Sequence, residues 1–247
     1  MNQPFANTTL GDIVAKDYHA AAIFERYGLD FCCGGRMSLA DACRQHGVDV
    51  QAVSSELSQL ARTEDTAPED PDSLIAHIVS KHHAYVRDAI PSIQSHLAKI
   101  IAAHGRTHPE VIRIASHFDV IAEELTLHLA KEERVLFPYI HSLAAASQNG
   151  GPPPPDVFGT VQNPIRMMET EHQDAGNELA AIRALASDYQ APDDACATYR
   201  LVYAELQAFE RDLHRHVHLE NNVLFPRAIE LEAEMAHKGR IGCESSR

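Results

Sequence analysis

The chain has 247 residues, 45% of them hydrophobic, enough to bury one large or two modest domains. Its formal net charge of −14 disfavours nucleic acid and anionic membrane surfaces as partners, because neither attracts an acidic protein. The start shows no secretory signal, no stretch approaches transmembrane length, and five cysteines, an odd number, do not fit a secreted disulfide framework, so we expect a cytoplasmic protein.

Residues 1–62 predict a small helical domain. Helices are expected through DIVAKDY, through HAAAIFERYG, from near Ser38 and through VDVQAVSSELSQLA. Thr9 or Asp12 can cap the first helix, and Gly28 suits the position just after the second. Short helices joined by glycine-containing turns are typical of a compact α-domain.

A linker and a second helical domain are expected to follow. Residues 63–72 (TEDTAPEDPD) are acidic and lack apolar periodicity, which is typical of a linker. Residues 73–237 predict a bundle, and 238–247 a tail. The four long helices should span roughly 71–103, 109–146, 164–187 and 193–237. The sequence therefore predicts an all-α fold, a small helical domain followed by an up-down-up-down four-helix bundle.

Three prolines fall within these expected helices. Pro91 should kink or break the first, while Pro138 and Pro226 should kink theirs or mark where each ends and restarts.

One phrase occurs twice in the chain, as HLAKEERVLFP at residues 128–138 and HVHLENNVLFP at residues 216–226. Each copy holds a histidine four residues before a glutamate, namely His128 with Glu132 and His216 with Glu220. Residues i and i+4 share a helix face, so both side chains can reach one ion or two neighbouring ions. Leucine four residues further on extends each face into apolar surface, so the polar pair should be buried and should need a metal.

A further histidine, His83 or His172, lies at nearly equal distance upstream of each copy. Four histidines and two glutamates are the ligand set of a non-haem di-iron centre inside a four-helix bundle. The set contains no thiolate, so it suits iron or manganese better than a structural zinc site.

Other polar residues near the repeated phrase have weaker patterns. His214 and His218 lie about 200° around the helix from His216 and are expected to be solvated. Surface positions are also expected for His77, His96, His104, His108, His117 and His141. Glu124 and Glu171 could each orient an imidazole or line an access path, or could be simply exposed.

Cys32 and Cys33 are adjacent in DFCCGG, where a mutual disulfide would strain the backbone. The exposed backbone of Gly34 and Gly35, with Arg36 nearby, would favour a thiolate and the close approach of a partner. A redox, metal or partner role is expected for the pair. The isolated cysteines are read as structural or incidental, namely Cys43, Cys196 and Cys243.

DFCCGG, the acidic linker and the doubled HxxxE…LFP together resemble the iron–sulfur cluster repair di-iron proteins, also called the repair-of-iron-centres family. The resemblance covers almost the whole chain, and the C-terminal part alone is similar to the wider hemerythrin-like group. It implies a non-haem di-iron centre held by His83, His128, Glu132, His172, His216 and Glu220. At the neighbouring His82 and His83, the family pattern favours His83.

The resemblance implies a function as well. Family members help restore iron–sulfur clusters damaged by nitric oxide or oxidants, through iron delivery or nitric oxide handling. The implied partners are damaged iron–sulfur proteins, nitric oxide and a reductant of unknown identity. A nitric oxide reductase-type activity at the two irons is an expectation from geometry, and the sequence is compatible with a homodimer.

Other functions compete with this one. A scavenger or sensor that binds nitric oxide or oxygen is the alternative, although dioxygen carriers of this fold resemble a five-histidine set with HxxxxD on the last helix. A ferritin-like oxidase would need a duplicated Glu-x-x-His, and only Glu169 with His172 offers that spacing near a ligand. A zinc hydrolase is disfavoured because six ligands leave little room for a bound water.

Overall fold

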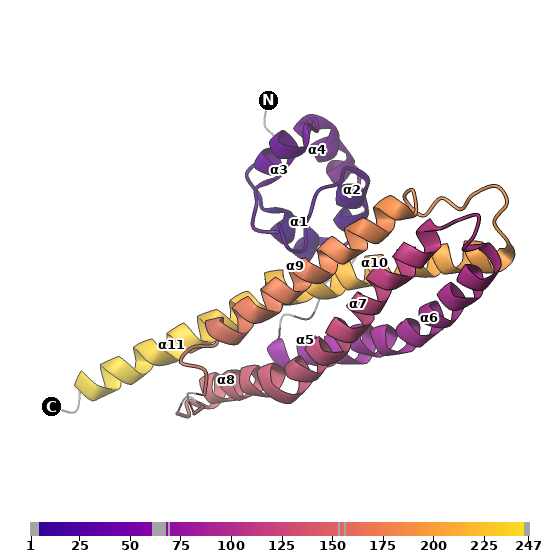
Figure 1. Cartoon of the computed structure of the whole chain (residues 1–247). Helices are drawn as coiled ribbons and strands as arrows, with labels where there is room; N and C mark the ends of the chain where they lie inside the picture. Colours follow the sequence, from indigo (N-terminus) through magenta and orange to yellow (C-terminus); the bar gives the residue numbers. More distant parts are fainter. Residues whose placement is uncertain (1–4, 61–67, 69, 153, 156, 245–247) are drawn as a thin grey trace. The chain divides into compact units, whose positions relative to one another are not determined.

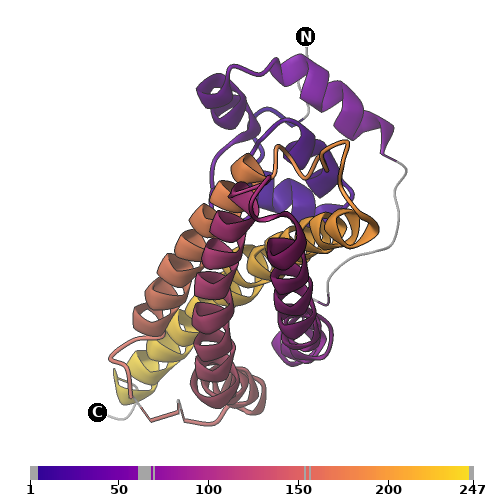
Figure 2. The same ribbon diagram turned by 45° about the vertical axis from the view of Figure 1, so that its right-hand side comes forward.

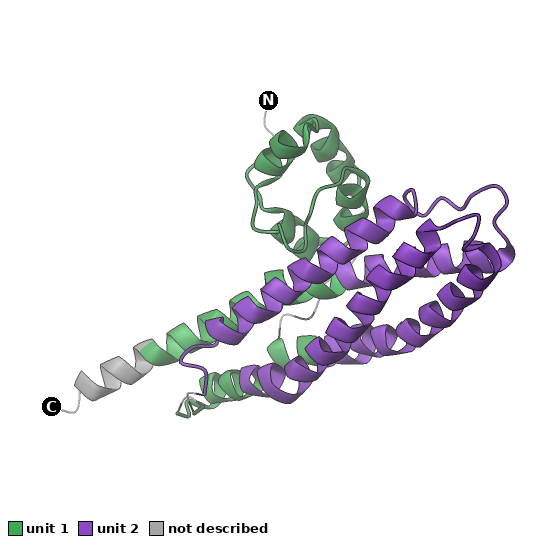
Figure 3. Cartoon of the chain, viewed as in Figure 1, with its two compact units in different colours: residues 1–75, 141–156, 215–247 green, residues 76–140, 157–214 purple. Residues whose placement is uncertain are grey.

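A computed structural model describes residues 5–60, 68, 70–152, 154–155 and 157–244, with side chains through residue 236. The part described is helical apart from its connections, which confirms the all-α prediction. The chain forms two compact units (Figure 3). Unit 1 contains residues 1–75, 141–156 and 215–247, and unit 2 contains residues 76–140 and 157–214.

Unit 1 begins with four short helices, α1 (Leu10–Lys16), α2 (Ala20–Arg26), α3 (Leu39–His46) and α4 (Val50–Gln59) (Figure 1). Side chains of Thr9, Ser38 and Asp49 accept a backbone N–H at the starts of α1, α3 and α4, as N-caps do. Gly28 follows α2 at a φ of +65°, which a side chain would disfavour. Apolar side chains fill the interior, among them Leu10, Phe24, Phe31, Leu39 and Val53.

Most of the predicted linker lies outside the described residues, which omit 61–67 and 69. Its last residues, from Pro71, already belong to a helix. The rest of the chain forms α5 (Pro71–His77), η1 (Ile78–His83), α6 (Ala84–His104), α7 (Glu110–Lys131), η2 (Glu132–Leu136), α8 (Phe137–Asn149), α9 (Gln162–Leu185), α10 (Ala197–Leu219), η3 (Glu220–Leu224) and α11 (Phe225–Glu244). Helix α11 therefore continues into the predicted tail.

Unit 2 contains η1, α6, α7, η2, α9 and the part of α10 up to residue 214. Consecutive long helices run in opposite directions, as predicted (Figures 1 and 2). Phe209 of α10 packs edge-on against Phe118 of α7, with ring centroids 5.3 Å apart. Apolar side chains at helical spacing, such as Ile114, Phe118 and Ile121 on α7, form this core because they share one helix face.

The segments labelled η1, η2 and η3 are π-helical turns, which are wider than α-helical turns and are frequent at functional sites. Pro138 and Pro226 occupy the second positions of α8 and α11, directly after η2 and η3. A proline lacks the N–H for the usual i−4 bond and its ring crowds that carbonyl, so a wider preceding turn accommodates it. The helical path therefore continues through both prolines, with neither end nor restart, and α6 likewise continues through Pro91.

Across the part of the chain that the structure describes, no helix combines the length and apolar character that crossing a membrane requires.

Candidate metal centre

Glu132 lies at the start of η2 and is completely buried in unit 2 between two imidazoles. Its Oε2 is 3.5 Å from Nε2 of His83, and its Oε1 is 3.3 Å from Nε2 of His128. His82, the neighbour of His83, instead places Nδ1 3.0 Å from Asp212 Oδ1. The structure therefore brings His83, and not His82, to the carboxylate of Glu132.

His172 of α9 adds a third imidazole to this half of the site. Its Nε2 lies 3.0 Å from Nε2 of His128, and both side chains are 2% exposed. Two ligand atoms at right angles on one ion, with bonds of about 2.1 Å, lie about 3.0 Å apart. The separation between the two imidazole nitrogens therefore matches the distance between adjacent ligand atoms on one ion.

The second copy of the repeated phrase gives the corresponding pair in unit 1. His216 lies in the last turn of α10, and its Nε2 is 3.0 Å from Oε1 of Glu220, the first residue of η3. Both side chains are completely buried. The i, i+4 spacing read from the sequence thus aligns an imidazole and a carboxylate in each copy.

Two buried groups of candidate ligands result, and Glu132 and Glu220 belong to both. The groups are His83, Glu132, His216 and Glu220, and His128, Glu132, His172 and Glu220; within each, one ligand atom per residue lies within 4.8 Å of the others. Two groups that share two carboxylates are consistent with a binuclear metal site, in which the carboxylates serve both ions.

The hydrogen bonding of Glu132 shows that these six residues suit a pair of cations. Among the described residues, the two buried oxygens of Glu132 have no hydrogen-bond partner. An isolated buried carboxylate is costly unless a positive charge compensates it. Imidazole and carboxylate groups without thiolate suit iron or manganese.

Two more carboxylates fix the orientation of the imidazoles. Glu171 accepts a hydrogen bond from Nδ1 of His128 at 2.8 Å and also pairs with Lys131. The hydrogen bond from His128 and then that from Lys131 lower the pKa of Glu171 to about 2, against the effect of burial. With its proton held on Nδ1, His128 turns the lone pair of Nε2 toward Glu132.

Glu133, which the sequence analysis missed, does the same for His83, whose Nδ1 lies 2.7 Å from its carboxylate. Arg87 donates to the same oxygen at 2.7 Å. Burial opposes ionisation, but these two hydrogen bonds lower the pKa of Glu133. One sequence signal exists: the first copy carries Glu-Arg directly after its glutamate ligand, where the second carries Asn-Asn.

Glu124, the other candidate for orienting an imidazole, is exposed on α7. The histidines predicted to lie at the surface are partly or fully exposed, and several contact carboxylates: His96 with Glu205, His108 with Asp194, His117 with Glu178 and His141 with Asp72. His214 is also partly exposed.

The expectation that His218 is solvated is wrong, because its side chain is 1% exposed. Its ring packs against Phe31, with centroids 5.9 Å apart, and its Nδ1 lies 3.3 Å from Nδ2 of Asn222. Burial lowers the pKa of His218 to about 4. The segment of residues 30–35, here called the cysteine loop, packs through Phe31 against this face of α10. Helical spacing alone does not reveal such a contact.

The cysteine loop is tied to the residues that directly follow Glu220. Asn222 Nδ2 donates to the carbonyl oxygens of Cys32 at 3.1 Å and Phe31 at 3.3 Å. Cys32 is buried and Cys33 half-buried. The hydrogen bond to Cys33, followed by burial, raises the pKa of Cys32, which does not favour the thiolate expected from the sequence.

Comparisons with known proteins agree with this architecture. A family model described as a domain of unknown function matches residues 6–61, and one described as the hemerythrin HHE cation binding domain matches residues 74–228. The chain is 34% identical over 229 residues to the iron–sulfur cluster repair protein YtfE of Dickeya chrysanthemi, covering 91% of this chain and 98% of that protein. The YtfE protein of Edwardsiella ictaluri is 36% identical over 231 residues with the same coverage, and that of Yersinia pestis 33% over 229 residues. The chain belongs to the YtfE family of iron–sulfur cluster repair proteins.

Proposed function

We propose that the two buried histidine and glutamate groups hold a non-haem di-iron centre. The residues are His83, His128, Glu132, His172, His216 and Glu220. The burial of Glu132 between two imidazoles carries the proposal, because both oxygens of this carboxylate lack a hydrogen-bond partner among the described residues. When bound, the two irons would supply redox chemistry and open positions for small ligands.

We further propose that the protein repairs iron–sulfur clusters damaged by nitric oxide or oxidative stress. Relatives that carry this name match 91% of the chain, and the hemerythrin segment contains all six proposed ligands. The clients would be damaged iron–sulfur proteins, and the chemistry would be iron delivery, nitric oxide handling or both. Cys32 and Cys33 would exchange electrons or dock the client, and a reductant would be needed. The odd number of cysteines favours a reducing cytoplasm as the location.

In this proposal the chain's own residues set up the site in two ways. Glu133 and Glu171 hold the Nδ1 protons of His83 and His128, which keeps both Nε2 atoms available as ligands. Leu136, one helical turn beyond Glu132, is buried, and a water-poor surrounding of this kind would strengthen the electrostatic interactions at the site.

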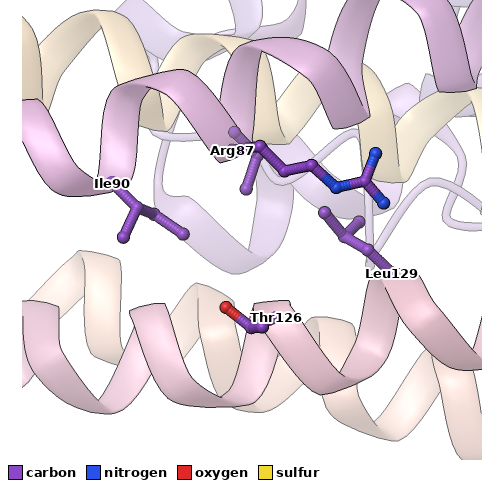
Figure 4. Close-up of a pocket in the computed structure, with 5 residues that line it drawn as sticks. Arg87, Ile90, Thr126 and Leu129 are labelled. Carbon is purple, nitrogen blue, oxygen red and sulfur yellow. The ribbon is translucent and has the colours of Figure 1, made fainter.

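An alternative is a scavenger or sensor that binds nitric oxide or oxygen. A cavity of about 130 Å³ between α6 and α7 favours it, since a diatomic molecule fits easily. Figure 4 shows Arg87 and Ile90 of α6 facing Thr126 and Leu129 of α7 across this cavity. Leu129, which follows His128 in the sequence, is one of the residues that line it. A nitric oxide reductase-type activity at the two irons would likewise require access for nitric oxide.

Reactivation of a nitric oxide-damaged [4Fe–4S] enzyme tests the proposed function. We expect the wild-type protein to restore activity and His128→Ala to restore little, while His117→Ala, a partly exposed histidine of the same helix, behaves as wild type. Nitric oxide uptake without reactivation by the wild type would favour the scavenger. Equal reactivation by His128→Ala and wild type would contradict a role for the metal site.

A further inference from the structure

The cysteine loop, which contains none of the six proposed iron ligands, brings three donor groups together. Sγ of Cys32 lies 3.9 Å from Sγ of Cys33 and 3.2 Å from Oδ1 of Asp30. One donor atom from each of the three residues lies within 4.8 Å of the others. We propose that Asp30, Cys32 and Cys33 form a second metal site, for one thiophilic divalent ion such as Fe²⁺ or Zn²⁺.

The separation of the sulfurs suits chelation of a single ion. A disulfide would hold them about 2.05 Å apart. Two thiolates on a tetrahedral ion with bonds of about 2.3 Å lie about 3.8 Å apart. The observed 3.9 Å is therefore close to the chelating separation, and binding requires little movement of the two side chains.

The loop that carries these donors is fixed from both sides. Oδ1 of Asp30 accepts the backbone N–H groups of Cys32 at 3.0 Å and Cys33 at 2.9 Å. On the other side, the carbonyl of Cys32 accepts a hydrogen bond from Asn222 at 3.1 Å. A loop already held in one conformation loses little freedom when an ion binds, which favours affinity.

A bound ion would also place a positive charge directly on the sulfur of Cys32. Its hydrogen bond to Cys33 and its burial raise the pKa of Cys32, which favours the protonated thiol when no ion is bound. Coordination removes the proton of a thiol, so each sulfur that binds the ion releases one proton to water.

The site should exchange its ion readily. Asp30 is exposed and Cys33 is half-buried, so solvent and chelators reach two of the three donors, while Cys32 is buried. Three protein donors leave a fourth position for water, the pattern of an open site rather than a closed structural one. If the proposed di-iron function holds, the loop would offer a temporary position for iron on residues held by the segment that follows Glu220.

Titration of the reduced, full-length protein with Co²⁺ tests the proposal, because a cobalt–thiolate bond gives a charge-transfer band in the near ultraviolet. We expect the band to saturate at one cobalt per chain, with proton release, and to disappear on adding EDTA. Cys32→Ser combined with Cys33→Ser should abolish it, while Cys196→Ser, at an exposed cysteine, should keep it. Asp30→Asn keeps an oxygen to cap the turn and should weaken binding by roughly tenfold or more.

A missing band at saturating Co²⁺, or a band that survives in the folded double serine variant, would overturn the proposal. Circular dichroism establishes that this variant is folded. The histidine and glutamate groups contain no thiolate, so cobalt bound there gives no such band. The result is therefore independent of whether the di-iron centre exists.

Discussion

At the scale of single residues, Glu132 distinguishes this protein from an ordinary helical bundle. A bundle core gains stability from apolar contacts and loses it when a carboxylate is buried without compensation. Glu132 has no exposed surface, and both of its oxygens face imidazole nitrogens. Such a residue costs stability in the metal-free protein and contributes to stability only when a cation is bound.

Glu132→Gln should separate these two effects, because it keeps the shape of the side chain and removes the charge. We expect bound iron to fall to roughly half or less, while the metal-free variant becomes at least as stable as metal-free wild type. Metal analysis and urea unfolding measure the two quantities. Glu124→Gln, at an exposed glutamate of the same stretch of chain, should change neither. Full iron retention in Glu132→Gln would exclude it as a ligand.

The pairing of the proposed ligands within one helix was easier to predict from the sequence than the residues that orient them. The i, i+4 geometry fixes the relation of His128 to Glu132 within one helix. Glu133 was missed because it meets His83 from a different helix, and the Glu-Arg pair after Glu132 does not say which histidine it contacts. His218 was placed in solvent because helical spacing gives the face of a residue but not what covers that face.

At the scale of elements, the cysteine loop depends on glycine for its close fit to η3. A Cβ added to Gly35 would lie 2.5 Å from the carbonyl oxygen of Phe31 and closer still to the Asn222 side chain. Gly11 of α1 is similarly close to Asn222. Nothing in the DFCCGG motif itself indicates this contact, since Asn222 lies far along the chain.

Gly35→Ala should therefore loosen the loop and lower the free energy of unfolding by about 1–3 kcal/mol. Gly176→Ala is the matched control, because a Cβ there meets nothing within 4 Å inside helix α9. That change should be neutral or stabilising by about 0.5–1 kcal/mol, as expected for glycine in a helix. Urea denaturation compares the two variants. Equal effects would mean that Gly35 does not need its close packing.

The side chain of His108 pairs with carboxylates at the start of α7 and in the loop before α10. Its Nε2 lies 3.1 Å from Asp194, and its Nδ1 lies 2.9 Å from Glu110. Hydrogen bonds to Asp194 and then Glu110 raise the pKa of His108 above 6.5. Its contribution to stability is thus fully present below the unfolded-state pKa and is lost as the pH rises through the raised folded-state pKa.

His108→Asn should accordingly destabilise the protein more at pH 6 than at pH 8.5. Thermal unfolding of wild type and variant at both pH values measures this difference. A loss of stability that is the same at both values would show that protonated His108 contributes nothing through these carboxylates.

At the scale of the whole molecule, the helical organisation follows from patterns that one sequence displays. Apolar residues at helical spacing, capping residues and the repeated phrase were sufficient for the element order. The π-helical turns were not predictable, because a proline such as Pro138 indicates a disturbed helix without specifying how the backbone accommodates it. Two of these wide turns, η2 and η3, begin at Glu132 and Glu220.

Metal binding should be coupled to the stability of the fold, since the proposed ligands come from segments far apart in the sequence. A metal that binds only the folded state at about 1,000 times its dissociation constant adds about 4 kcal/mol to the free energy of unfolding. The iron-loaded protein should therefore melt at a clearly higher temperature than the metal-free form. Identical melting temperatures would argue against a buried site formed by several helices.

The most direct test of the di-iron assignment is Mössbauer spectroscopy with iron analysis on protein purified without oxygen, before and after nitric oxide is added. We predict two irons per chain, antiferromagnetically coupled, that form nitrosyls. Zinc in their place, or at most one iron without a nitrosyl signal, would contradict a redox-active di-iron centre.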